Sequence, residues 1–224
     1  MNSSADVAHN LATVRAHIVD AARAADRDPA SITLIAASKE QPESAIEAAL
    51  TAGLVEFAEN RVQELVHKAA ALAGTGARWH MIGRLQRNKV RAAAPYVSLW
   101  QSVDRVALAE EIARRSPGAS LLVQVNVAGE AQKGGCAPGA TEDLIDACRA
   151  LGCDVQGLMT VPPAEIDPRA VFEQLRKMVD RAGLGVCSMG MSGDYEAAIA
   201  EGSTMVRIGS AIFGPRPGGA RARR

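Results

Sequence analysis

The sequence has few aromatic residues, no excess of either charge and no long apolar run. Phe, Trp and Tyr make up 3% of its 224 residues, and 25 Lys and Arg residues balance 25 Asp and Glu residues. A chain without net charge has no overall field that attracts nucleic acid or an anionic membrane. No segment approaches the roughly 20 apolar residues that a membrane span needs. We therefore expect no binding to nucleic acid and no membrane contact.

Cysteine is also scarce. Cys136, Cys148, Cys153 and Cys187 include no CxxC pair and have no histidine at ligand spacing. This predicts free structural thiols in a reducing compartment and no metal site. Residues 1–28 have the pattern of an amphipathic helix and lack the compact apolar stretch of a secretory signal. We therefore expect a cytoplasmic protein.

Short apolar runs alternate with stretches of helical periodicity along the whole chain, as in a parallel α/β fold. There are eight such runs, at residues 33–39, 54–60, 77–83, 98–104, 120–127, 154–161, 185–190 and 204–213. Eight repeats predict a single (β/α)8 TIM barrel with an extra N-terminal helix. An open doubly wound sheet is the alternative, but its usual GxGxxG motif is missing. We expect one domain over residues 1–214 and a basic, disordered tail over residues 215–224.

The ends of these runs are unusually polar, and in a barrel the functional side chains project from the carboxyl ends of the strands. Lys39 closes the first run and Arg207 lies in the last one. His80, in the third run, is either a pocket residue or a hydrogen-bonded core histidine, and the sequence leaves both open. The other polar residues at or near run ends are Glu59, Asn60, Asp104, Gln124, Asn126, Thr160, Ser188, Ser192 and Ser210.

Lys39 is the sharpest candidate among them. An amine that closes an apolar strand and points into a barrel is partly desolvated, which lowers its pKa and leaves more of the free amine that attacks a carbonyl. A lysine that extends from a strand end to water is the plainer interpretation.

The loops after the last two runs favour the first interpretation. They read SMGMSGDYEAAIAEG and RIGSAIFG, and a barrel usually binds phosphate in these two loops. Ser192, Gly193, Gly209 and Ser210 are small, so their backbone amides and hydroxyls could surround a dianion.

A lysine amine beside a phosphate site describes a Schiff-base site for a phosphorylated carbonyl compound. A phosphosugar aldolase and a protein that binds pyridoxal 5′-phosphate both fit. In a closed barrel the last strand neighbours the first, so Arg207 lies close to Lys39. An arginine there could donate to a pyridine nitrogen and keep it unprotonated, which favours pyridoxal phosphate.

The motifs AASKEQP, EFAENRVQE, WHMIGRLQRNK, SVDR, QVNVAGEAQKGG, GLMTV and SMGMSGDYEAAIAEGSTMVRIGSAIFG occur in this order between about residues 30 and 214. In these motifs the chain resembles the pyridoxal phosphate homeostasis proteins, the YggS/PROSC family, which have the fold of the alanine racemase N-terminal barrel. The departures are small: Ala37, Ala58, Arg84 and Ser210 stand where the family commonly has valine, glycine, proline and threonine.

The resemblance implies a fold-type III barrel that holds pyridoxal phosphate as an internal aldimine on Lys39. It places Asn60 near the cofactor ring and Arg207 near the pyridine nitrogen. It also implies that Ile82 and Met189 wall the ring, and that Ser192, Gly209 and Ser210 bind the phosphate.

The resemblance further implies a monomeric protein of pyridoxal phosphate homeostasis, which stores the cofactor and delivers it to apo-enzymes without a defined catalytic reaction. A weakly active amino-acid racemase is the alternative. Such a racemase needs a second base, and of the two tyrosines, Tyr96 and Tyr195, neither ends an apolar run. Since the sequence stops soon after the last run, we expect no added domain that supplies one. A third possibility, a pure interaction scaffold, would not need Lys39, Arg207 and the two loops together.

Overall fold

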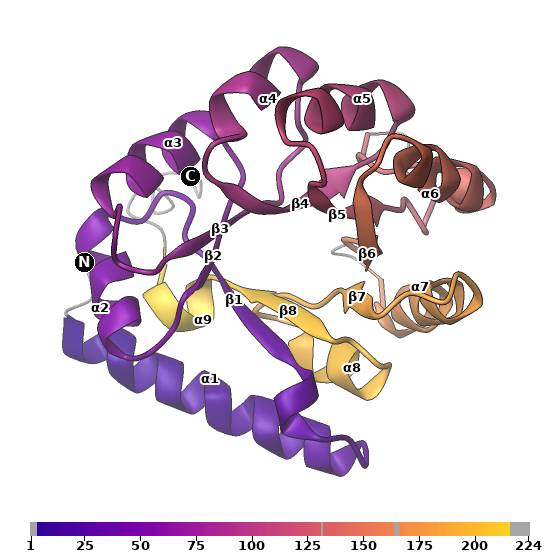
Figure 1. Ribbon diagram of the computed structural model, residues 1–224. Helices are drawn as coiled ribbons and strands as arrows, with labels where there is room; N and C mark the ends of the chain where they lie inside the picture. Colours follow the sequence, from indigo (N-terminus) through magenta and orange to yellow (C-terminus); the bar gives the residue numbers. More distant parts are fainter. Residues whose placement is uncertain (1–3, 131, 164–165, 216–224) are drawn as a thin grey trace, which may run out of the picture.

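Eight parallel strands close into one barrel in the computed structural model, which describes residues 4–130, 132–163 and 166–215. The strands follow the order of the sequence, and β1 pairs with β8 to complete the ring. Figure 1 shows this ring with the helices around it. The strands are β1 (Thr33–Ala37), β2 (Glu56–Glu59), β3 (Arg78–Met81), β4 (Val97–Val103), β5 (Ser120–Gln124), β6 (Asp154–Met159), β7 (Val186–Ser188) and β8 (Met205–Ile208). The predicted TIM barrel is confirmed.

A helix follows each strand and covers the outside of the barrel. The helices are α1 (Ser4–Ala24), α2 (Glu43–Thr51), α3 (Val62–Ala71), α4 (Arg87–Ala93), α5 (Val106–Arg115), α6 (Thr141–Ala150), α7 (Arg169–Arg181), α8 (Tyr195–Ala200) and α9 (Ser210–Phe213). Two short 3-10 helices cover Pro29–Ser31 and Pro138–Ala140. The sequence spacing explains the packing: α7 buries Val171, Phe172, Leu175 and Val179, which lie on one helical face.

The alternation of side chains along each strand divides the core in two. One set points into the barrel, where Ile35, Ala58, Leu99, Leu122, Met159 and Met205 form a small cluster. The other set points outward and joins the apolar faces of the helices in a much larger cluster. Residues at strand ends that share the inward alternation therefore point to the barrel mouth.

The last predicted strand is the one that differs most from the structure. Residues 204–213 formed one apolar run, but β8 ends at Ile208 and Ser210–Phe213 form the short helix α9. The N–H groups of Ile212 and Phe213 both donate to the carbonyl of Gly209, at 3.0 and 2.9 Å. The chain therefore turns into a helix just where the strand reaches the barrel mouth.

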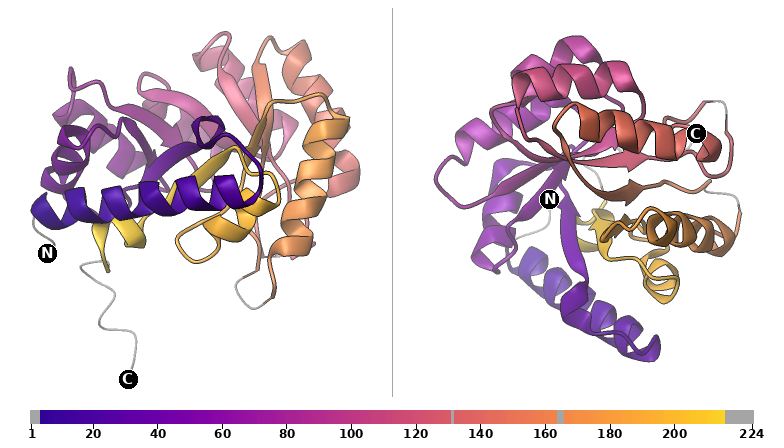
Figure 2. Two further views of the ribbon diagram at one scale, coloured as in Figure 1. Left: turned by 90° about the horizontal axis from the view of Figure 1, so that it is seen from below. Right: turned by 45° about the vertical axis from the view of Figure 1, so that its right-hand side comes forward.

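Helix α1 lies along the outside of the barrel beside α2, α8 and α9 (Figures 1 and 2). Its buried residues recur every three or four positions and are Val7, Leu11, Val14, Ile18 and Ala22. Because α9 has only four residues, α1 covers the part of the barrel that α9 is too short to cover.

Within the described ranges, no helix is long and apolar enough to cross a membrane. The same residues contain no group of three His, Cys, Asp or Glu side chains that could hold a metal ion. All four cysteines are free, and burial raises the pKa of the Cys148 and Cys187 thiols to about 12. The predicted tail of residues 215–224 lies outside the described residues except for Pro215.

Candidate functional site

A cavity of about 220 Å³ lies at the carboxyl ends of β1, β7 and β8. Five of the residues that the sequence singled out meet there: Lys39, Ser192, Arg207, Gly209 and Ser210. Gly193, which was predicted beside Ser192 as part of a phosphate site, lines the cavity as well. The remaining lining residues are Ala37, Gln41, Met191 and Gly214.

Three predicted residues do not line this cavity. Asn60 follows β2 and is exposed, and Ile82 is half-buried beside the inner core cluster. Met189 is fully buried in the outer core, with its sulfur 3.6 Å from the Cys187 sulfur. The methionine on the cavity is Met191, which is 37% exposed.

Lys39 has the same alternation as Ile35 and Ala37, which carries it into the barrel mouth. Its neighbour Ser38 points the other way and belongs to a buried polar cluster. The Ser38 hydroxyl donates to Glu59 Oε1 at 2.8 Å. Lys68 Nζ donates to the same carboxylate oxygen and to the Ser38 carbonyl, both at 2.7 Å. This cluster fixes the backbone just before Lys39.

The backbone just after Lys39 is fixed as well. Glu40 has a φ of 62°, which is unusual for a residue other than glycine. Its N–H donates to Glu64 Oε2 at 2.8 Å, and this carboxylate also lies 3.4 Å from Lys68 Nζ. The same lysine thus connects the contacts on both sides of Lys39, so the strand end is held rather than free.

The two loops after β7 and β8 meet through Ser192. The N–H groups of Gly209 and Ala211 approach Ser192 Oγ at 3.2 and 3.4 Å. Asp194 Oδ1 accepts from the N–H of Met191 at 2.5 Å and so shapes the first loop. A Cβ atom at Gly209 would lie 3.0 Å from the Ala37 carbonyl, so this close approach favours glycine. The result is a pair of loops joined at the Ser192 hydroxyl, which lines the cavity with Lys39.

Arg207 supplies the positive charge at the floor of the cavity. Its side chain is 3% exposed, and its guanidinium donates to Ser188 Oγ at 2.6 Å and to the Thr160 carbonyl at 2.8 Å. Burial lowers the pKa of Arg207 to about 10, so the group remains charged at neutral pH. Among the described residues no carboxylate forms a salt bridge with it. The Asp194 carboxylate opposes the lowering of this pKa from a distance, without direct contact. A buried cation that no carboxylate contacts directly favours an anionic ligand.

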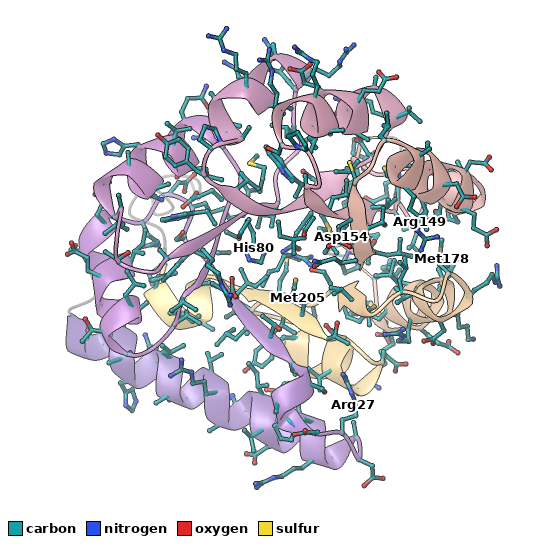
Figure 3. All side chains as sticks on the ribbon, in the orientation of Figure 1. Arg27, His80, Arg149, Asp154, Met178 and Met205 are labelled. Carbon is teal, nitrogen blue, oxygen red and sulfur yellow. The ribbon has the colours of Figure 1, made fainter. Side chains whose placement is uncertain are left out.

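His80 does not line the cavity but lies inside the ring of strands, as Figure 3 shows. Its Nε2 is 2.9 Å from Glu56 Oε2, and its Nδ1 is 2.8 Å from Gln101 Nε2. The choice left open by the sequence therefore resolves to a hydrogen-bonded core histidine. Gln101 was not among the predicted residues, although a glutamine within the apolar strand SLWQSV signals a buried polar contact.

The chain is similar to several known proteins over nearly its whole length. Residues 3–217 match the family model of the alanine racemase N-terminal domain. The pyridoxal phosphate homeostasis protein of Pseudomonas aeruginosa is 43% identical, with 96% of this chain and 98% of the relative covered. The protein of the same name from Escherichia coli is 42% identical, with 94% and 97% covered. The structure of PipY from Synechococcus elongatus with pyridoxal phosphate bound has a TM-score of 0.81 and 33% identity, with 93% of this chain and all of PipY covered.

Proposed function

Because the chain belongs to the family of pyridoxal phosphate homeostasis proteins, we propose that it binds pyridoxal 5′-phosphate at the barrel mouth. We further propose that it holds the cofactor covalently on Lys39, stores it, and delivers it to apo-enzymes as a cytoplasmic monomer. The observation that carries the proposal is one cavity that unites the Lys39 amine, the buried Arg207 guanidinium and the hydroxyl of Ser192.

Each part of the cavity fits one part of the cofactor. Pyridoxal phosphate supplies an aldehyde that condenses reversibly with a primary amine, an aromatic nitrogen and a phosphate dianion. Lys39 offers the amine, and Arg207 offers a fixed N–H donor that suits an unprotonated ring nitrogen. Ser192 and Ser210 offer hydroxyl donors for the phosphate, and the Gly209 N–H, which donates to Ser192 Oγ in this structure, orients the first of them. The buried charge of Arg207 also offsets part of the ligand's negative charge.

The tyrosines support storage over two-base racemisation. The Tyr195 side chain is buried, and its hydroxyl is 3.1 Å from His17 Nδ1 on helix α1, outside the barrel. Burial also raises the pKa of Tyr195. Tyr96 lies in the turn between α4 and β4, at the amino end of the barrel. Neither tyrosine lines the cavity, so neither is in place to act as a second base.

Reductive trapping tests the covalent site. The protein is loaded with pyridoxal phosphate, treated with borohydride and digested, and the modified lysine is identified by mass spectrometry. The chain has five lysines, and we expect the label on Lys39 alone. Lys39→Ala should lose the visible absorbance of the Schiff base, while Lys177→Ala, on the exposed face of α7, should keep it. A label on a different lysine in the wild-type protein would overturn the assignment.

Delivery is tested by mixing the loaded protein with an apo-aminotransferase in the presence of an enzyme that destroys free pyridoxal phosphate. Direct transfer predicts activation that persists with the scavenger and increases with carrier concentration. Activation that the scavenger abolishes would refute direct transfer. Incubation with L-alanine in deuterated water tests the racemase alternative, since exchange of the α-proton at turnover rates would favour an enzyme.

A further inference from the structure

We propose that Ser188 and Gln101 are positioning residues, which orient Arg207 through a chain of hydrogen bonds that crosses the barrel interior and ends at Glu56. The inference rests on the proposed function, because it assigns these residues a role in how the cofactor ring is held. The hydrogen bonds themselves are present in the protein alone, so their direction can be measured without cofactor.

This chain of hydrogen bonds is continuous and almost wholly buried. Arg207 donates to Ser188 Oγ at 2.6 Å, and Ser188 Oγ is 2.8 Å from Gln101 Oε1. Gln101 Nε2 is 2.8 Å from His80 Nδ1, and His80 Nε2 is 2.9 Å from Glu56 Oε2. Arg207, Ser188, Gln101 and His80 are each 4% exposed or less. The hydrogen bonds therefore connect strands β8, β7, β4, β3 and β2, from the mouth toward the amino end of the barrel.

The direction of every bond follows from Arg207. The guanidinium can only donate, so Ser188 Oγ accepts from it and must send its own proton to Gln101 Oε1. The amide nitrogen of Gln101 then donates to His80 Nδ1. His80 is therefore neutral with its proton on Nε2, which donates to the Glu56 carboxylate. Reversing any one link would leave two donors or two acceptors facing each other in a buried place.

This arrangement fixes the guanidinium without neutralising it. Both terminal nitrogens of Arg207 are held by neutral oxygens, those of Ser188 and the Thr160 carbonyl. The only carboxylate in this series of hydrogen bonds belongs to Glu56. Ser188, Gln101 and His80 lie between it and Arg207. A carboxylate in direct contact would hold Arg207 equally well but would cancel the charge that faces the cavity. This relay, a series of neutral hydrogen-bonding groups, orients the guanidinium and leaves its positive charge directed at the cavity.

Ser188→Ala tests the relay because it removes one oxygen and leaves Arg207 and Gln101 without a shared partner. With pyridoxal phosphate labelled with ¹⁵N in the ring, we expect the wild-type protein to show an unprotonated ring nitrogen by NMR. In Ser188→Ala we expect a shift toward the protonated nitrogen and about tenfold weaker cofactor binding, as for loss of one hydrogen bond to a charged group. Ser188→Thr keeps the hydroxyl and should restore the wild-type nitrogen signal.

Ser120→Ala is the matched control. Ser120 starts β5 at the opposite end of the barrel and makes one side-chain hydrogen bond, to Asp154 Oδ2 at 3.0 Å. We expect wild-type binding and an unchanged ring-nitrogen signal in this variant. A Ser188→Ala protein that is folded and keeps the wild-type affinity and ring-nitrogen signal would overturn the positioning role.

A second measurement separates failure of the relay from failure of the proposed function. In the cofactor-free wild-type protein, ¹⁵N NMR of the histidine rings should show His80 neutral, with its proton on Nε2. This result would support the relay even if no cofactor bound or if Ser188→Ala did not fold. A proton on Nδ1 of His80 would show that the hydrogen bonds do not have the directions that we infer.

Discussion

Lys68 connects the contacts on either side of Lys39, and it forms a buried ion pair with Glu59. Lys68 is 4% exposed and Glu59 is completely buried, with the Lys68 ammonium 2.7 Å from Glu59 Oε1. Glu59 Oε2 is buried and has no hydrogen-bond partner among the residues that the structure describes. Burial raises the pKa of Glu59, and the hydrogen bonds from Lys68 and Ser38 oppose this shift. The Lys68 ammonium therefore favours the charged form of this carboxylate against the effect of burial.

We predict that Lys68→Met destabilises the protein by about 3–5 kcal/mol at pH 8, the usual cost of removing one partner from a buried pair. Without the ammonium, the pKa of Glu59 in the folded state rises further above its unfolded value. Such a carboxyl stabilises the fold fully below its unfolded pKa, and this stability is lost as pH rises through the folded value. The variant should therefore be less destabilised at pH 5 than at pH 8, as urea denaturation at both values would measure.

Lys177→Met is the control for this prediction, because Lys177 pairs with Glu173 at 2.5 Å on an exposed helix face. Exposed pairs contribute little, so we expect a change below about 1 kcal/mol at either pH. If Lys68→Met were no more destabilising than Lys177→Met, the Lys68 ammonium would not be what compensates the burial of Glu59.

At the scale of elements, the loop from β3 to α4 rests directly on the end of β2. A Cβ atom at Gly83 would lie 2.1 Å from the carbonyl oxygen of Asn60, which real structures do not allow. The hydroxyl of Ser102 also donates to the Gly83 carbonyl at 2.7 Å, so the loop is held from β4 as well. Gly83 thus lets three strand ends meet at the barrel mouth.

Gly83→Ala should destabilise the protein by about 1–3 kcal/mol, as overpacking of a tight contact does. It should also move Asn60, which we expect near the cofactor ring, and so weaken cofactor binding. Gly139→Ala is the comparison, since a Cβ there has no atom within 4 Å and should change stability by less than about 0.5 kcal/mol. Urea denaturation and cofactor titration of both variants test this prediction. Equal stability and equal cofactor affinity of the two variants would contradict a close contact between Gly83 and Asn60.

The elements were predictable because their signals are local. Alternation and helical spacing located all eight strands, and strand-end polarity located Lys39 and Arg207. The last strand was predicted too long, because the segment SAIF is apolar whether it forms a strand or a helix. Its hydrogen bonds to the Gly209 carbonyl make it a helix. The Lys68 cluster and the partners of Gln101 were missed for a different reason. They join residues on different elements, and one sequence does not show which buried polar groups pair.

At the scale of the whole molecule, helix α1 completes the outer layer of the barrel. It packs against α2, α8 and α9, and its Asn10 side chain donates to the Ile212 carbonyl at 3.0 Å. Helix α9 directly follows Gly209, one of the residues that line the cavity. The N-terminal helix therefore supports the element that follows Gly209, where we propose that the phosphate binds, although α1 lies outside the barrel.

Leu11→Ala tests this support. Leu11 is completely buried, in the middle of the face that α1 presents to the barrel. Its truncation should destabilise the protein by about 2–5 kcal/mol, the range for buried leucines, because the rigid helices around it cannot close the cavity. Leu151→Ala, at a residue 38% exposed, should change stability by about 0.5 kcal/mol or less. If α1 were only an appendage, thermal unfolding of Leu11→Ala would show a small early transition followed by the main transition at its wild-type temperature. We expect instead a single transition at lower temperature, because α1 and the barrel share one continuous core.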